Sequence, residues 1–226
     1  MQAEILHQPR WTQTALGTPI ELYRKGHTGS PTMIFVGGVH GDEPEGVYLA
    51  LELLNWLKSA EKSETPLRNW ILIPNFNPDG SAKSQRTNGR GVDLNRNFPS
   101  SDWNGESKAL RYFPGPTPAS EPEIQALCTL LNQEKLDLIV HFHSWEPSIV
   151  YTGPAGKPWA ELLAASSGYS AKEDIGYPTP GSLGQYGAFS LKVPVICVEA
   201  QEKSDLKTLW PKFGPGLQRM MKEDPS

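Results

Sequence analysis

Several residue types that mark special classes of protein are scarce in this 226-residue chain. It has only two cysteines, Cys128 and Cys197, and each lies next to Leu, Ile or Val. A secreted protein that depends on disulfides carries more, so we expect both to be reduced, buried thiols in a cytoplasmic protein, with a single disulfide as the alternative. No apolar run approaches the ~20 residues of a membrane-spanning helix. The first residues also lack the basic start and apolar stretch of a signal peptide. We therefore expect no export and no membrane partner.

Positive charge is also in short supply. The chain has 21 Lys and Arg residues against 25 Asp and Glu residues, a formal net charge of −4, and it contains no block of five like charges. A surface that follows the phosphates of nucleic acid needs the opposite balance. We therefore expect no nucleic-acid partner. No pattern in the sequence indicates an oligomeric state.

Apolar segments that alternate with helical patterns predict an α/β fold. Strands are expected at 20–24, 32–36, 69–74, 136–143 and 193–199, and helices at 43–62, 121–133, 159–167 and 206–221. The continuous apolar run in 136–143 is typical of a strand that is covered on both faces. A single core can serve a chain of ~200–250 residues when the fold is α/β. We therefore expect residues 1–226 to form a single domain with a largely parallel or mixed central sheet.

A long segment, residues 75–117, interrupts this alternation. It is rich in Asn, Gly, Pro, Ser and Arg, and it exceeds the ~12–15 residues that a structureless loop usually reaches. Long ordered loops in compact domains are usually functional. Arg86, Arg90 and Arg96 lie close together in it, and arginine binds carboxylates and oxyanions through two parallel hydrogen bonds. The segment therefore predicts a site for an anionic group, with a solvated basic loop as the alternative.

Three of the five histidines follow or end predicted strands, where an α/β sheet presents its site. His40 comes after a glycine-rich turn, and Glu43 lies three residues further on, close enough to bind one ion with it. Catalytic zinc commonly takes three protein ligands from His and Glu. His141 and His143 face the same side of their strand, so spacing alone leaves both open as the third ligand. A capped helix start and a structural histidine are the alternative interpretations.

Glu199 is an acidic residue at the end of an apolar strand. It follows six apolar or small residues, and a carboxylate in such surroundings must be paired or have a raised pKa. A carboxylate of this kind suits a general base that acts on a water activated by a metal. A glutamate at the exposed end of a strand is the alternative.

Taken together, these residues resemble the zinc carboxypeptidase family. The motifs occur in the family's order, from about residue 34 to residue 200: His40-x-x-Glu43, Asn77-Pro78-Asp79-Gly80, Arg86-Thr87-Asn88, Val92-Asp93-Leu94-Asn95-Arg96-Asn97-Phe98-Pro99, His143-Ser144-Trp145 and Glu199. Gly41-Asp42-Glu43 and Tyr177-Pro178-Thr179-Pro180-Gly181-Ser182 are similar to a short bacterial branch of the family, the murein peptide amidases.

The resemblance implies a zinc hydrolase built on a mixed eight-stranded sheet between helices. It implies that His40, Glu43 and His143 bind one Zn²⁺, and it selects His143 because the third ligand of the family is followed by Ser and an aromatic residue. It further implies that Glu199 is the catalytic base. Arg86 is then the group that polarises the scissile carbonyl.

The substrate is also implied by the resemblance. Asn95 and Arg96 correspond to residues that hold the terminal carboxylate of a small peptide, and Tyr177 to a mobile tyrosine that closes over it. The family keeps a cis peptide bond after the third ligand, which predicts one between Ser144 and Trp145. For the murein peptide amidase branch, the implied reaction is hydrolysis of the γ-D-glutamyl–diaminopimelate bond.

Three alternatives stay open. A general carboxypeptidase that prefers an apolar C-terminal residue has the same residues. An aspartoacylase-like deacylase of N-acyl amino acids shares the early His-x-x-Glu motif, but it usually carries a β-rich C-terminal domain and only 27 residues follow Glu199 here. A binding module without activity is opposed by the presence of every candidate catalytic residue.

Overall fold

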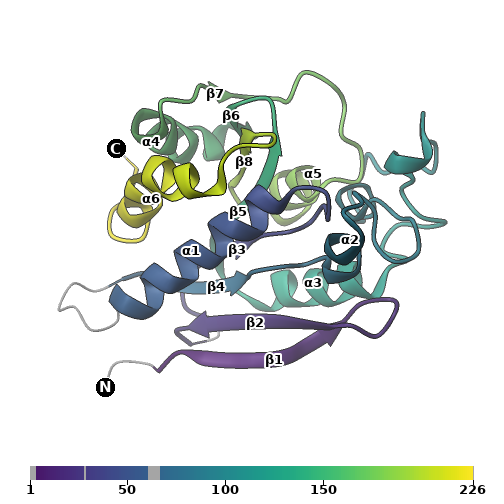
Figure 1. The fold of residues 1–226 in the computed structure, drawn as a ribbon, viewed down its shortest axis with the longest axis horizontal. Coiled ribbons are helices and arrows are strands. Elements are labelled where there is room, and N and C mark those ends of the chain that lie inside the picture. Colours follow the sequence, from purple (N-terminus) through teal and green to yellow (C-terminus); the bar gives the residue numbers. More distant parts are fainter. Residues whose placement is uncertain (1–3, 28, 61–66, 226) are drawn as a thin grey trace.

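A computed structural model describes residues 4–27, 29–60 and 67–225. Its eight-stranded sheet has the order β1-β2-β4-β3-β5-β8-β6-β7 (Figure 1). The strands are β1 (Leu6–Gln13), β2 (Pro19–Lys25), β3 (Thr32–Val36), β4 (Asn69–Ile73), β5 (Leu136–Trp145), β6 (Ser148–Thr152), β7 (Ala171–Lys172) and β8 (Val195–Gln201). The central strands β4, β3, β5 and β8 run parallel, whereas β1/β2, β2/β4 and β6/β8 are antiparallel. The sheet is mixed, as predicted.

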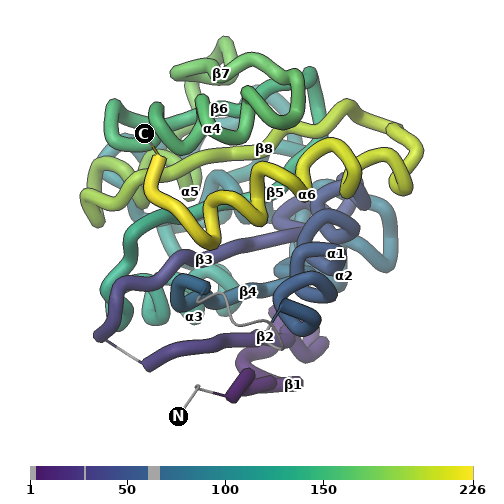
Figure 2. The backbone as a smooth tube through the Cα atoms, turned by 90° about the vertical axis from the view of Figure 1, so that its left-hand side faces the viewer, coloured from purple at the N-terminus to yellow at the C-terminus, as the bar shows by residue number. Residues whose placement is uncertain are grey.

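Helices cover both faces of the sheet, as predicted (Figure 2). One face packs against the long helices α1 (Pro44–Ala60), α4 (Lys157–Ser167) and α6 (Leu209–Met220). The other packs against α3 (Pro122–Gln133) and the short α5 (Leu183–Gln185). Alternation along β3 divides its side chains between the two layers, because Phe35 joins the first and Ile34 the second. The result is one three-layer α/β domain.

The elements expected from apolar patterns are present, with small shifts of their ends. The helix expected at 206–221 is divided, because a 3₁₀ turn at Leu206–Thr208 precedes α6. Residues 61 and 62 of the helix expected at 43–62 lie outside the described residues. Within the described part of the chain, no helix combines the length and apolar character needed to cross a bilayer.

Two features differ from the expectations. β1, β6 and β7 were not predicted, because β1 is an edge strand without a buried residue and β7 has only two residues. The segment 75–117 is ordered as expected, but the short helix α2 (Pro78–Lys83) and the 3₁₀ turns at Leu94–Arg96 and Leu110–Tyr112 within it were not predicted. Both cysteines are free thiols, Cys197 buried and Cys128 half-buried.

The pairing of β5 with β8 places His143 and Glu199 side by side next to the hydrophobic core. Phe142 lies opposite Val198, and both side chains are buried in the layer of α1 and α6. The next pair, His143 and Glu199, therefore points to the opposite face. Since parallel strands bring their carboxyl ends to one edge, this pair lies where an α/β sheet presents its site.

Gly46 sets how closely α1 approaches this edge. A Cβ atom at Gly46 would collide with the backbone carbonyl of Phe142 in β5. Without that atom, the first turn of α1 rests directly on the strand. This contact brings Glu43, which lies just before the helix, to the side chain of His143 in the same strand.

Candidate metal centre and catalytic site

Three predicted metal ligands converge at the carboxyl end of the parallel strands. His40 Nδ1 lies 2.8 Å from Glu43 Oε1, and His143 Nδ1 lies 2.8 Å from Glu43 Oε2. The two Nδ1 atoms are 2.9 Å apart. None of the three residues is more than 9% exposed. The turn after β3, the residue before α1 and the end of β5 therefore supply one buried cluster.

The chemistry of this cluster fits a zinc ion. Burial alone would raise the pKa of Glu43, but the charges of His40 and His143 and their hydrogen bonds hold that pKa well below its usual range. The cluster thus offers an ionised carboxylate and two imidazole nitrogens, which is the donor set of many catalytic zinc sites. These three side chains also satisfy the spacing of a metal-binding group.

Asp93, for which the sequence motifs predicted no role, lies against the side of His40 that faces away from Glu43. Its Oδ1 lies 3.1 Å from His40 Nε2, and its Oδ2 accepts a hydrogen bond from Arg86 Nε at 2.8 Å. Burial would raise the pKa of Asp93, but Arg86 and His40 lower it far below its usual range. The carboxylate can therefore accept a hydrogen bond from the Nε2–H of His40, which leaves Nδ1 free to face Glu43. Only the Asp-x-Asn-Arg context of Asp93 hinted at this role.

Glu199 lies beside the cluster, opposite His143 in the sheet. Its side chain is 5% exposed, and the thiol of Cys197 donates a hydrogen bond to Oε1 at 3.2 Å. Burial raises the pKa of Glu199, and the charge of His143 opposes part of that rise. Burial likewise raises the pKa of the Cys197 thiol. Glu199 is thus the buried carboxylate that its apolar surroundings predicted.

Arg86 lies at the open edge of the cluster. In addition to Asp93, it donates a hydrogen bond from Nη1 to Glu43 Oε1 at 3.4 Å. Its guanidinium carbon lies 5.2 Å from the centre of the Tyr112 ring. These contacts hold a cation beside the group that would bind the metal.

Two of the three predicted substrate-binding residues line an adjacent groove of about 540 Å³. Arg96, Tyr112 and Tyr177 line it. Arg96 is buried and donates to the backbone oxygen of Asn95 at 2.7 Å, while Asn95 Oδ1 accepts the backbone N–H of Leu183 at 2.9 Å. Both side chains are therefore fixed by the protein.

Tyr177 covers one side of this groove. It is 41% exposed and packs edge-on against Trp145, with 5.5 Å between ring centres. Burial raises the pKa of its hydroxyl, and the charges of Arg96 and Arg86 oppose the rise. The structure thus brings Tyr177 near both arginines.

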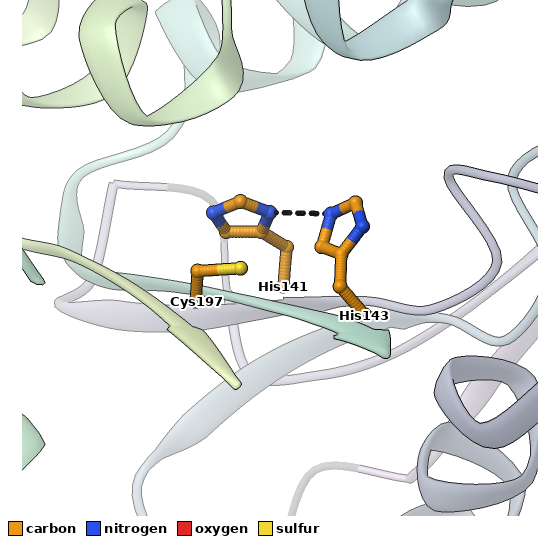
Figure 3. Close-up of side chains that lie close together, drawn as sticks. All are labelled: His141, His143 and Cys197. Atoms are coloured by element: carbon orange, nitrogen blue, oxygen red, sulfur yellow. Dashed lines mark hydrogen bonds between the residues drawn. The ribbon is translucent and has the colours of Figure 1, made fainter. Parts of the chain in front are cut away.

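His141 extends the cluster inward along β5. Its Nδ1 lies 2.9 Å from His143 Nε2, and Cys197 lies opposite it in β8 (Figure 3). His141, His143 and Cys197 form a second group with metal-binding spacing. His143 belongs to both groups. Its Nδ1 atom faces Glu43 and His40, and its Nε2 atom faces His141.

The peptide bond between Ser144 and Trp145 is trans, so the expected cis bond is wrong. Both residues continue the regular pairing of β5 with β8, opposite Ala200 and Gln201. Extended strand pairing of this kind uses trans backbone, and the Trp145 carbonyl continues it by accepting the Glu202 N–H at 3.1 Å.

Comparison with known proteins identifies the family. The sequence profile of the zinc carboxypeptidases matches residues 4–174. This chain belongs to the zinc carboxypeptidase family. Murein peptide amidase A of Escherichia coli K12 is 31% identical over 201 residues, which cover 84% of this chain and 78% of the relative.

Solved zinc carboxypeptidase structures share the fold of this family member. The murein-tripeptide amidase of E. coli O157 superposes with a TM-score of 0.78 at 24% identity and covers 97% of this chain and 93% of that one. Carboxypeptidase A of Helicoverpa armigera gives a TM-score of 0.79 at 18% identity, with coverages of 96% and 66%. The predicted family and fold class are confirmed. The roles of individual site residues, and a single catalytic domain spanning 1–226, stay predictions.

We expect this zinc carboxypeptidase, purified without chelator, to contain about one Zn²⁺ per chain, in line with three-ligand catalytic sites. Glu43→Ala and His143→Ala should lose the metal, because each removes one of three ligand atoms. Elemental analysis of the desalted protein measures this. The exposed His7 serves as the control, and His7→Ala should retain the metal. A site emptied by His141→Ala but not by His143→Ala would show that the third ligand was chosen wrongly.

Proposed function

We propose that this zinc carboxypeptidase hydrolyses the γ-D-glutamyl–diaminopimelate bond of small murein peptides in the cytoplasm. The observation that carries the proposal is the convergence of a three-ligand group, a buried carboxylate and an arginine-lined groove at one edge of the sheet. The name of the E. coli relative supports the substrate class. Two free cysteine thiols fit a reducing compartment.

The residues divide the reaction between them. His40, Glu43 and His143 would hold the Zn²⁺ ion, which when bound would act as a Lewis acid toward water and the scissile carbonyl. Glu199 accepts the proton of the attacking water and passes it to the leaving amine as the C–N bond breaks. Arg86 stabilises the negative charge that develops on the carbonyl oxygen.

Arg96 and Asn95 select where the cut is made. A guanidinium binds a carboxylate through two parallel hydrogen bonds, and Arg96 lines the groove beside the cluster. The free carboxylate next to the scissile amide would be held there, with Tyr177 closing over it. The enzyme therefore trims a terminal residue and leaves internal bonds intact.

The far part of the groove supports diaminopimelate as the released residue. Glu106 and Lys108, on the exposed loop 104–108, are among the residues that line the groove, and neither forms an ion pair with another described residue. Diaminopimelate carries a second ammonium and a second carboxylate beyond the scissile amide. An acidic and a basic side chain that line the same groove match that pair of charges.

Glu199→Gln should retain Zn²⁺ yet lose about 10²–10⁴-fold in turnover, because the amide cannot accept a proton from water. Elemental analysis and the rate of amine release measure the two effects separately. Retained metal with nearly normal turnover would remove Glu199 from the mechanism.

Incubation with L-Ala-γ-D-Glu-meso-diaminopimelate, beside a panel of ordinary L-peptides and N-acyl amino acids, tests the substrate. We expect release of diaminopimelate, because the groove offers partners for both of its amino-carboxyl centres. Chromatography of the products measures it. Preferential cleavage of L-peptides would instead identify a general carboxypeptidase, and cleavage of acyl amino acids alone would identify a deacylase.

Lys108→Ala should reduce the preference for diaminopimelate over lysine at the released position, because lysine lacks the distal carboxylate. Loss of one ion pair to an exposed lysine, worth up to about 1 kcal/mol, corresponds to about 2–5-fold in kcat/KM for the diaminopimelate substrate alone. Kinetics with the two matched tripeptides measure it. Lys172→Ala, an exposed lysine on β7, is the control. An unchanged preference in Lys108→Ala would place the distal centre elsewhere.

A further inference from the structure

His141 is a buried imidazole that the proposed reaction leaves unused. It lies two residues before His143 on the same face of β5 and is 4% exposed. Its Nδ1 is 2.9 Å from His143 Nε2, and the two rings meet edge to face with 4.9 Å between centres (Figure 3). A polar group this deep is expensive to bury unless it makes hydrogen bonds.

Both histidines of the metal group have a partner on the side away from Glu43. His40 has Asp93, whose Oδ1 lies 3.1 Å from Nε2, and His143 has His141 in the equivalent place. A neutral imidazole presents a lone pair on Nδ1 only when its proton is on Nε2. An acceptor at Nε2 therefore fixes both the tautomer and the orientation of the ring.

We propose that His141 is the positioning residue of His143. His141 Nδ1 accepts a hydrogen bond from the Nε2–H of His143, so that Nδ1 of His143 faces Glu43 with its lone pair free for Zn²⁺. His141 carries its own proton on the other nitrogen, which Figure 3 shows pointing away from His143. The proposal rests on the metal group of the proposed function and adds a residue that raises its affinity for zinc.

A second metal ion between His141, His143 and Cys197 is the competing explanation. The thiol of Cys197 donates a hydrogen bond to Glu199 Oε1 at 3.2 Å, whereas a metal ligand must be the thiolate. In addition, His143 would need lone pairs on both nitrogens to bind two ions. The hydrogen bond from His143 to His141 requires neither change, and the geometry therefore favours positioning.

Zinc affinity measured by competition with a chelating dye tests the proposal. His141→Leu keeps a comparable volume without an acceptor and should bind Zn²⁺ about 10–100-fold more weakly, as loss of such partners typically does. His141→Asn places an oxygen near the position of Nδ1 and should stay within a few-fold of the wild type. Cys197→Ala, which alters the facing residue but not the hydrogen bond, should leave zinc affinity unchanged. Wild-type affinity in a folded His141→Leu would overturn the proposal.

Spectra of the wild-type chain test it without any substitution. Imidazole ¹⁵N NMR of the zinc-loaded protein should show His143 protonated at Nε2 and metal-bound at Nδ1. The Co²⁺-loaded protein should lack a thiolate-to-cobalt charge-transfer band. A metal bound through Nε2, or a charge-transfer band that Cys197→Ala removes, would overturn the proposal. A wild type that binds no zinc would instead refute the metal group itself.

Discussion

The pairing of β5 with β8 is the constraint on which the candidate site depends. Phe142 and Val198 lie opposite each other in the apolar layer, so the next pair along, His143 and Glu199, must face the other side. A slip of one residue in either strand would turn its polar residues into the apolar layer. The hydrophobic core therefore specifies the distance between the proposed metal ligand His143 and the proposed base Glu199.

A network of buried charges places the loop residues relative to this pair. Glu43, Arg86, Asp93 and His40 form a continuous chain of hydrogen bonds in which each charged group has an opposite partner. A buried charge without a partner strongly destabilises the folded state. Because these four groups share partners, breaking one contact also weakens the contacts next to it. The long segment after β4 is therefore ordered where it must supply Arg86 and Asp93.

The amino-acid sequence predicted the parts of the fold that are fully buried. β3 and β5 appear in the sequence as continuous apolar runs, and the helices appear as apolar residues three or four positions apart. β1 has no such apolar pattern, because an exposed edge strand needs no apolar residues. His40 and Glu43 were predicted because their contact is local. Asp93 was assigned no role because its partner His40 lies 53 positions away in sequence, and such contacts follow from the tertiary fold alone.

The choice between His141 and His143 shows the limit of spacing arguments. Alternation places both on one face, so only the residues that face them distinguish their roles. His143, near the end of the strand, contacts Glu43 through Nδ1. His141, deeper in the sheet, contacts the Nε2 atom of His143. Only the resemblance to a family separated the two before their surroundings were known.

The two halves of the candidate site are built on different supports. Glu199, at 5% exposure, lies on a central strand, whereas Tyr177, at 41%, and Lys108 lie on loops around the groove. Strands hold a catalytic group to within fractions of an ångström, and loops tolerate changes of sequence and length. Substitutions around the groove can therefore change which residue is released and leave the buried cluster undisturbed. In such an arrangement, specificity and chemistry are separable properties of one domain.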